Sequence, residues 1–274
     1  MTRVCLTAAL LLATALTLPA QVRPRDNDFG RADWCQDSSR NRSGPDRSAS
    51  YCELREATLS GQKAIDADAG ANGGIAVRGW DSADVHVRAR VSAYAPTDAE
   101  ARAIVSQVAL TTAGGRIRAD GPEMRREAGW SASFEILVPR NTRLSLNARN
   151  GGLSLASFVG TAEMRTVNGG VNINDVSGDI RGRTQNGGIS AELTGQSWTG
   201  RGLDLETSNG GVTISMPTNY SADLETGTVN GGLRIDFPVT LQGQLGRQVR
   251  TRIGGGGPVV RAVTTNGGVN IRAR

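Results

Sequence analysis

From residue 144 to the C-terminus, apolar and polar positions alternate in step with a repeated Asn-Gly-Gly. At even distances before each Asn the residues are mostly apolar or Thr, and at odd distances they are polar or charged. After the two glycines the parity reverses. Alternation with a period of two indicates strands with one buried face. Each repeat is therefore predicted to be two strands that meet at a glycine corner, where the missing Cβ allows positive φ.

The spacing of the repeat predicts how these strands are stacked. Six successive asparagines are 18, 18, 23, 21 and 36 residues apart, and a further Asn-Gly-Gly begins at Asn72. Periods near 20 residues are typical of solenoids. Two all-β folds fit the parity: a right-handed parallel β-helix with one short helix, or an antiparallel β meander or barrel, because Asn-Gly is also a hairpin signal. The parallel β-helix is favoured, since a coil covers its own apolar face and an open meander does not.

Two polar columns accompany the apolar ones. In the parallel fold both are expected to point inward and to hydrogen-bond from coil to coil as ladders, because a buried polar group without a partner costs about 1–3 kcal/mol. The predicted ladder residues are Asn150, Asn168, Asn186, Asn209, Asn230 and Asn266, with Thr166, Thr184, Thr207, Thr228 and Thr264.

The segment before residue 140 is less regular. Residues 65–91 alternate as strands do, and Thr97-Asp98-Ala99-Glu100 is a capping box that predicts a helix ending near Gln107. This helix is expected to cover an open edge or side of the sheet. Further strands are expected at residues 108–112 and 130–138.

The first 60 residues predict export. Residues 1–20 form a signal peptide, with Arg3 before an apolar stretch and Leu18-Pro19-Ala20 as the cleavage site. Residues 21–60 are interpreted as a leader or cap, and residues 61–274 as the solenoid domain. Cys35 and Cys52 are separated by 16 residues, and in an oxidising compartment they predict a disulfide. Without a second apolar run long enough to span a bilayer, the protein is predicted to be periplasmic or secreted.

The C-terminal repeats determine whether the solenoid ends in an unpaired strand. The 36-residue gap between the last two repeats is interpreted as a decayed coil, with a turn at residues 254–258 and an excursion at residues 242–251. The final strand has no visible cap, so it is predicted to be an open edge. Either a partner binds at this end, or the charges of Arg272 and Arg274 discourage pairing with another chain.

The sequence offers little chemistry. The formal net charge is +5, basic and acidic residues alternate, and no nucleic-acid patch is indicated. With His86 as the one histidine, neither a metal site nor a catalytic triad is expected, and no cofactor is implied. Acidic residues on neighbouring repeats face arginines and are interpreted as ion pairs. The best ligand-contact candidates are Trp198 and Arg201, because an aromatic plane beside a cation suits a sugar or an anionic polymer.

The repeated Thr-x-Asn-Gly-Gly-Val-x-Ile, as in residues 166–173 and 264–271, resembles a bacterial family of exported β-strand-repeat proteins catalogued as putative adhesins. Trp34-Cys35, Tyr51-Cys52-Glu53 and the Gly-rich turn at residues 254–258 are also similar to that family. The resemblance implies a β-helix-like fold and a location in the cell envelope. It supplies no catalytic residues.

Together these features predict a non-enzymatic binding or adhesion module of the bacterial envelope. A cell-wall or surface glycan, or an envelope protein, is the expected partner. Two alternatives stay open: a polysaccharide-active β-helix enzyme, which would need clustered carboxylates, and an envelope-stress sensor domain, which would need a protein partner.

Overall fold

The computed structural model of the chain describes residues 34–35, 48–239 and 248–274. These ranges are mostly β-strand and contain one α-helix, α2 (Asp98–Gln107). Its predicted start is confirmed, because the Thr97 hydroxyl accepts a hydrogen bond from the Glu100 backbone N–H at 3.3 Å. The predicted signal peptide at residues 1–20 lies outside the described residues.

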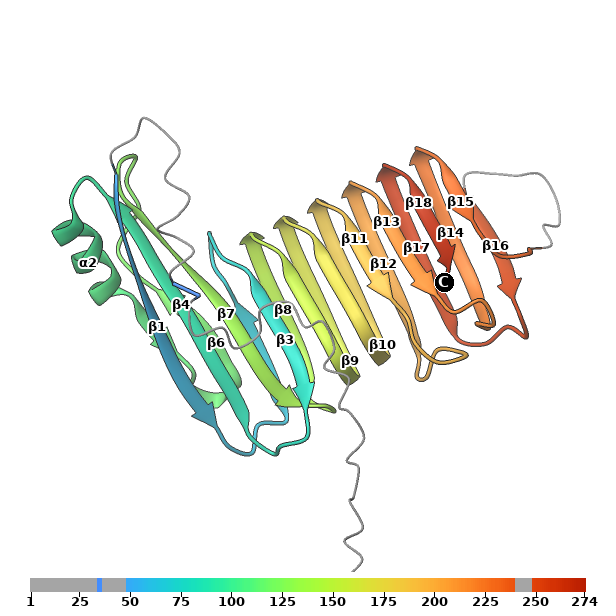
Figure 1. Cartoon of the computed structure of the whole chain (residues 1–274), viewed down its shortest axis with the longest axis horizontal. Helices are drawn as coiled ribbons and strands as arrows, with labels where there is room; N and C mark the ends of the chain where they lie inside the picture. Colours follow the sequence, from blue (N-terminus) through green and yellow to red (C-terminus); the bar gives the residue numbers. More distant parts are fainter. Residues whose placement is uncertain (1–33, 36–47, 240–247) are drawn as a thin grey trace, which may run out of the picture. The chain divides into compact units, whose positions relative to one another are not determined.

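The Asn-Gly-Gly repeats form a β-solenoid-like stack of coils, each of which we name by the Asn at its corner. Strands before the Asn pair in parallel with one another, and so do strands after the second Gly. The first set, here the pre-Asn sheet, comprises β2 (Ala64–Asp68), β8 (Arg143–Asn150), the second halves of β9 (Leu153–Asn168) and β10 (Val171–Asn186), β12 (Gly202–Asn209), β17 (Val259–Asn266) and β14 (Ala222–Asn230). The second, the post-Gly sheet, comprises β3 (Ile75–Trp80), the first halves of β9 and β10, β11 (Ile189–Glu192), β13 (Val212–Met216), β18 (Val269–Ala273) and β15 (Leu233–Ile235). Figure 1 shows the coils side by side.

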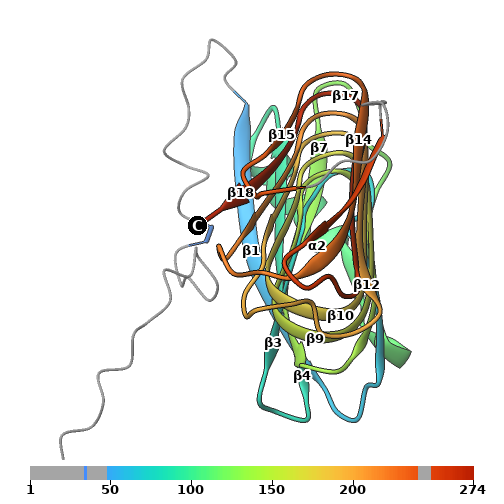
Figure 2. The same cartoon turned by 90° about the vertical axis from the view of Figure 1, so that its right-hand side faces the viewer.

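The core lies between these two sheets, whose strands appear on opposite sides in Figure 2. The predicted apolar columns are buried in every interior coil, as for Leu203 and Leu205 before Asn209, and Val212 and Ile214 after it. The parallel solenoid is therefore confirmed over the antiparallel meander. Right-handed winding stays a prediction.

At the corner the two glycines have different roles. A Cβ on Gly169, the first glycine of the Asn168 coil, would lie 2.0 Å from the Gly151 carbonyl oxygen of the neighbouring coil. At Gly152, a second glycine, the nearest atom would be 3.5 Å away. Close approach of backbones therefore requires glycine at the first position. The second position is less crowded, with the nearest backbone oxygen 2.8 Å away at Gly74, 3.2 Å at Gly170 and 3.5 Å at Gly152.

The threonine column points inward, as predicted, but it does not stack on itself. Each threonine hydroxyl donates to the carbonyl of the first corner glycine in the adjacent coil. These bonds are 2.8–2.9 Å long and join Thr166 to Gly151, Thr184 to Gly169, Thr207 to Gly187, Thr264 to Gly210 and Thr228 to Gly267.

The asparagine column forms an amide ladder on the surface. The prediction that these side chains point inward is wrong: the six asparagines are exposed, since the corner turns them out of the core. The side-chain amide of each of these six still donates to the Oδ1 of the asparagine before it in the ladder, at 2.8–3.2 Å. The order along the ladder is Asn72, Asn150, Asn168, Asn186, Asn209, Asn266, Asn230.

That order shows that the last coil is not at the end of the stack. β17 pairs with β12 on one side and β14 on the other, and β18 likewise lies between β13 and β15. Figure 1 shows these C-terminal strands between the two earlier coils. The prediction of an open edge at Arg272 and Arg274 is therefore wrong. The predicted decayed coil is also wrong, because β16 (Gln248–Ile253) runs antiparallel to β14.

Further strands extend the stack beyond its first coil, with parallel pairing where they join it and antiparallel pairing beyond. β7 (Gly129–Pro139) pairs with β3, followed by β4 (Val85–Ala95) and β1 (Ala49–Leu59). On the other sheet β6 (Arg116–Asp120) pairs with β2, and β5 (Ala109–Thr111) with β6, after the short 3-10 helix η1 (Ala113–Gly115). Helix α2 packs Val105 on Val91 and Ala93 of β4, so it covers the side of the sheet. Arg55 of β1 donates to the carbonyls of Val105 and Val108 and so satisfies the C-terminal end of α2.

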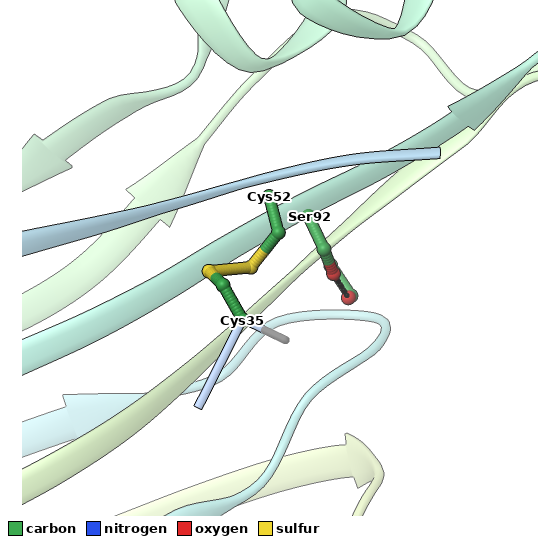
Figure 3. Close-up of a disulfide and its surroundings, with 4 residues drawn as sticks. Cys35, Cys52 and Ser92 are labelled. Carbon is green, nitrogen blue, oxygen red and sulfur yellow. Dashed lines mark hydrogen bonds between the residues drawn. A yellow bond between two sulfur atoms is a disulfide. The ribbon is translucent and has the colours of Figure 1, made fainter. Parts of the chain in front are cut away.

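The disulfide between Cys35 and Cys52 is present (Figure 3). Cys52 belongs to β1 and is paired in register with Ser92 of β4. The bond therefore ties residues 34–35 to the outer face of this antiparallel extension, where the Arg88 guanidinium lies 5.9 Å from the centre of the Trp34 ring.

Candidate functional site

The ligand-contact pair expected from the sequence is not presented to solvent as a pair. Trp198 is 3% exposed, belongs to the core, and donates its indole N–H to the Gly178 carbonyl at 2.9 Å. The ring closes the corner of a coil and has no face for a ligand, which corrects the expectation for this residue. Arg201 is 87% exposed and lies 3.9 Å from the Asp179 carboxylate.

The carboxylates that a polysaccharide-cleaving site would need are held by arginines. Arg183 of β10 and Arg261 of β17 flank Asp204 of β12, with nitrogen to oxygen distances of 2.7 and 2.5 Å, and both arginines also reach Glu206. Desolvation acts to lower the pKa of Arg261, but its hydrogen bonds to Asp204 and Glu206 outweigh this and raise the pKa. The ion pairing predicted from the sequence is confirmed, and these acids are occupied with structural contacts.

A groove crosses the outer face of the pre-Asn sheet beside the asparagine corner. We call it the arginine groove. It has a volume of about 680 Å³ and is lined by Asp68, Gly70, Ala71, Asn147, Ala148, Arg149, Arg165, Thr166, Val167, Arg183, Thr184, Gln185, Glu206 and Ser208. Its lining comes from five neighbouring strands of one continuous sheet, so backbone hydrogen bonds hold its floor in place.

The polar wall of the groove is a row in strict register. Asp68 is paired with Asn147, Asn147 with Arg165, Arg165 with Arg183, and Arg183 with Glu206. Because the parallel strands lie about 4.8 Å apart, the row repeats at that interval across the sheet. The arrangement offers regularly spaced side chains to an extended molecule that lies across the strands.

The arginines of the groove differ in their partners. Arg183 is committed to Asp204 and Glu206, and Arg165 contacts Glu163 of its own strand. Arg149 is exposed and forms no ion pair with any residue of the described ranges. A guanidinium that keeps its donors available can bind a carboxylate or phosphate through two parallel hydrogen bonds.

The outward-facing positions of the repeat indicate this groove, although the inward-facing columns do not. The outward positions one and three residues before each Asn hold Arg149, Arg165 and Arg183 on consecutive coils. The strand register brings Arg165 and Arg183 into one wall, with Arg149 two residues along its strand from that row. Trp198 and Arg201 looked more like ligand contacts because aromatic residues are rare in the chain.

Comparison with known proteins identifies the family. A family model described as Toastrack DUF4097 matches residues 75–272, which is most of the chain. The chain belongs to the Toastrack DUF4097 family. The resemblance to bacterial β-strand-repeat proteins catalogued as putative adhesins is confirmed by this match. No curated protein matches the chain.

Several solved structures are similar over most of the Toastrack chain. A putative cell adhesion protein from Clostridium sporogenes ATCC 15579 is 9% identical, with a TM-score of 0.40, over 82% of this chain and 100% of that one. A putative adhesin from Bacteroides fragilis NCTC 9343 is 11% identical, with a TM-score of 0.36, over 81% and 97%. A putative lipid binding protein from Parabacteroides distasonis ATCC 8503 is 10% identical, with a TM-score of 0.29, over 80% and 96%.

The disulfide fits an oxidising, extracytoplasmic compartment. Among the described residues, no helix is long and apolar enough to cross a membrane. The same residues contain no group of three or more His, Cys, Asp or Glu side chains placed to hold a metal ion.

Proposed function

We propose that this Toastrack protein is a non-enzymatic, exported binding module whose arginine groove holds an extended anionic polysaccharide. The observation that carries the proposal is the in-register wall from Asn147 through Arg165 to Arg183, with Arg149 beside it. An extended polymer can meet one side chain on each strand as it crosses the sheet. Carboxylate or phosphate groups on the polymer would pair with the guanidinium of Arg149 and with the exposed part of Arg165, while Arg183 stays paired with Asp204 and Glu206.

The rigidity of the groove supports a binding role. Its floor runs over Ala148, Thr166 and Thr184, which are buried residues of three neighbouring strands that are hydrogen-bonded to one another. A preformed site loses little conformational entropy when a ligand binds, so modest contacts repeated along a polymer can give useful affinity. The acids of a polysaccharide-cleaving site would have to be free of their arginines, and Asp204 and Glu206 are not. A binding role therefore fits the contacts better than the enzyme alternative.

The decisive test compares anionic with neutral polysaccharides. Binding of the mature protein to an acidic polysaccharide and to an uncharged one of similar length is measured by titration calorimetry at low and at high salt. We expect the acidic polymer to bind, the neutral one to bind at least tenfold more weakly, and salt to weaken binding, because the ionic contacts are exposed.

Variants locate the site. Arg149→Ala/Arg165→Ala should reduce affinity at least tenfold. The matched control, Arg234→Ala/Arg250→Ala, removes two other exposed arginines and the same net charge, so it should change affinity less than threefold. Equal losses in the two double variants would show that only the net charge of the protein affects binding. Equal binding of the acidic and the neutral polymer would refute the proposal that the ligand is anionic.

A further inference from the structure

The end of the solenoid at the Asn230 coil has an open strand edge with which none of the described residues pairs. This edge lies away from the arginine groove. The Asn230 coil is the last in the stack, because β15 pairs with β18 alone and the described residues place no strand on its other side. The first part of this edge is occupied, since β16 pairs with residues 222–227 of β14. The open part therefore runs from Thr228 to Ile235.

Burial shows that the core ends uncovered at this coil. Leu233 occupies the third position after the repeat Asn and is 36% exposed. Its equivalents in the interior coils are at most 2% exposed: Leu153, Val171, Ile189, Val212 and Val269. One more coil laid against this end would bury Leu233 as the neighbouring coils bury those residues.

The hydrogen-bond pattern of the interior coils defines what the open coil still offers. At each interior corner, the first glycine N–H donates to the Asn carbonyl of the next coil, and the residue after the second glycine donates to a glycine carbonyl, as in Gly169 to Asn186 and Val171 to Gly188. The next coil in turn donates its Asn amide to the Asn Oδ1 and its Thr hydroxyl to the first glycine carbonyl. In the Asn230 coil, the described residues provide no partner for the corresponding four groups. These are the N–H of Gly231, the N–H of Leu233, the Oδ1 of Asn230 and the carbonyl of Gly231.

We propose that this end binds an extended segment of a second protein that carries its own Thr-x-Asn-Gly-Gly corner and adds to the stack as a parallel strand. The four open groups match the groups that such a corner presents, two donors against two carbonyls and two acceptors against an amide and a hydroxyl. Strand addition at an open edge is a general mode of peptide recognition, in which backbone bonds give affinity and side-chain pockets give specificity.

The chain itself shows that a coil need not come from the adjacent part of the sequence. The Asn266 coil joins the Asn209 coil with the same register and the same corner bonds as sequential coils have. A segment from another molecule meets the same template. A second copy of this chain cannot extend the stack head to tail through its first coil, because β7 and β6 already pair with β3 and β2 there.

The test uses the full mature chain and a labelled peptide with the sequence of residues 165–174, Arg-Thr-Val-Asn-Gly-Gly-Val-Asn-Ile-Asn. Fluorescence anisotropy should show saturable binding. A peptide with Leu in place of the central Asn should bind at least fivefold more weakly, because it cannot donate to Asn230.

Two substitutions at one position separate strand addition at this edge from peptide binding at another surface. Leu233→Pro removes the open N–H but leaves the pairing with β18, because the Val269 N–H donates to Gly232 and not to Leu233. Leu233→Val keeps the N–H and an apolar side chain. We expect at least a tenfold loss of peptide affinity for Leu233→Pro and less than a twofold change for Leu233→Val, with both variants folded by circular dichroism.

Three outcomes would overturn the proposal. Peptide binding that is equal in both variants would place the peptide elsewhere. A dimer in light scattering that Leu233→Pro dissociates would show that a second copy occupies the edge. Absence of peptide binding in wild type, together with its appearance after deletion of residues 240–247, would show that the chain covers its own edge. None of these outcomes depends on polysaccharide binding in the arginine groove.

Discussion

Two buried threonines with opposite hydrogen-bond status allow a sharp test of the threonine column. Thr207 donates its hydroxyl to the Gly187 carbonyl at 2.8 Å, and its side chain is buried. Thr226 is also buried, at 2% exposed, but its hydroxyl has no hydrogen-bond partner among the described residues. Thr226 lies four residues before its Asn, in a column that is apolar in most other coils. Valine has nearly the same shape as threonine, so Thr→Val removes the hydroxyl with little change in packing.

The two substitutions should have different effects on the free energy of unfolding. Thr207→Val breaks one bond and leaves the Gly187 carbonyl unpaired, so we expect a loss of about 1–2 kcal/mol. Thr226→Val removes a hydroxyl that is desolvated without compensation, so we expect no loss, or a gain of up to about 1 kcal/mol. The loss for Thr207→Val corresponds to a fall in Tm of about 2–8 °C at the size of this domain.

Urea unfolding followed by circular dichroism measures both effects, with calorimetry as an independent check on Tm. The slope of unfolding free energy against urea should be the same in wild type and both variants, since the area exposed on unfolding does not change. Equal stability of Thr207→Val and wild type would show that the bond to Gly187 contributes nothing. A loss in Thr226→Val as large as that in Thr207→Val would show that the hydroxyl bonds are not what the threonines contribute.

Two further predictions concern the corner and the pH dependence of stability. Gly187→Ala should cost more than about 3 kcal/mol or prevent folding, because the new Cβ would lie 2.0 Å from the Gly169 carbonyl oxygen. Gly188→Ala, whose Cβ would be 3.5 Å from the Gly211 carbonyl oxygen, should cost less than about 1 kcal/mol; similar urea midpoints for the two variants would contradict the different roles of the two glycines. Burial raises the pKa of Tyr220 to about 12, so the folded state keeps a proton that the unfolded state loses from about pH 10. Its contribution is fully present below pH 10 and is lost between pH 10 and 12, by about 2–3 kcal/mol, and Tyr220→Phe should remove that part of the alkaline loss.

The sequence predicted the features that local physics determines. The alternation of apolar and polar positions predicted that Leu203 and Val212 lie in the core, and the capping box predicted the start of α2. The predicted export to an oxidising compartment indicated a disulfide between Cys35 and Cys52. Each of these follows from neighbouring residues or from pairing that has only one possible partner.

The sequence did not predict features for which several strands or side chains could serve equally well as the partner. Every coil presents nearly the same edge, so nothing in the repeat shows that the Asn266 coil inserts before the Asn230 coil. Amide bonds between asparagines of neighbouring coils were predicted, but the side of the ladder was wrong, because the parity reversal occurs at the corner itself and leaves the direction of the Asn side chain open. Trp198 was interpreted as a ligand contact because it lies in an insertion close to Arg201 in the sequence. The sequence did not reveal that the Gly178 carbonyl accepts its indole N–H.

Because the Asn266 coil lies between two coils that precede it in the sequence, the stack is continuous only when residues 259–273 are in place. Without these residues, the Asn209 and Asn230 coils would each lack the neighbour that joins them. A prematurely terminated chain therefore carries two unpaired strand edges, which proteases and chaperones recognise readily. Loss of the segment 259–273 would therefore expose strand edges in the middle of the stack and not at its end.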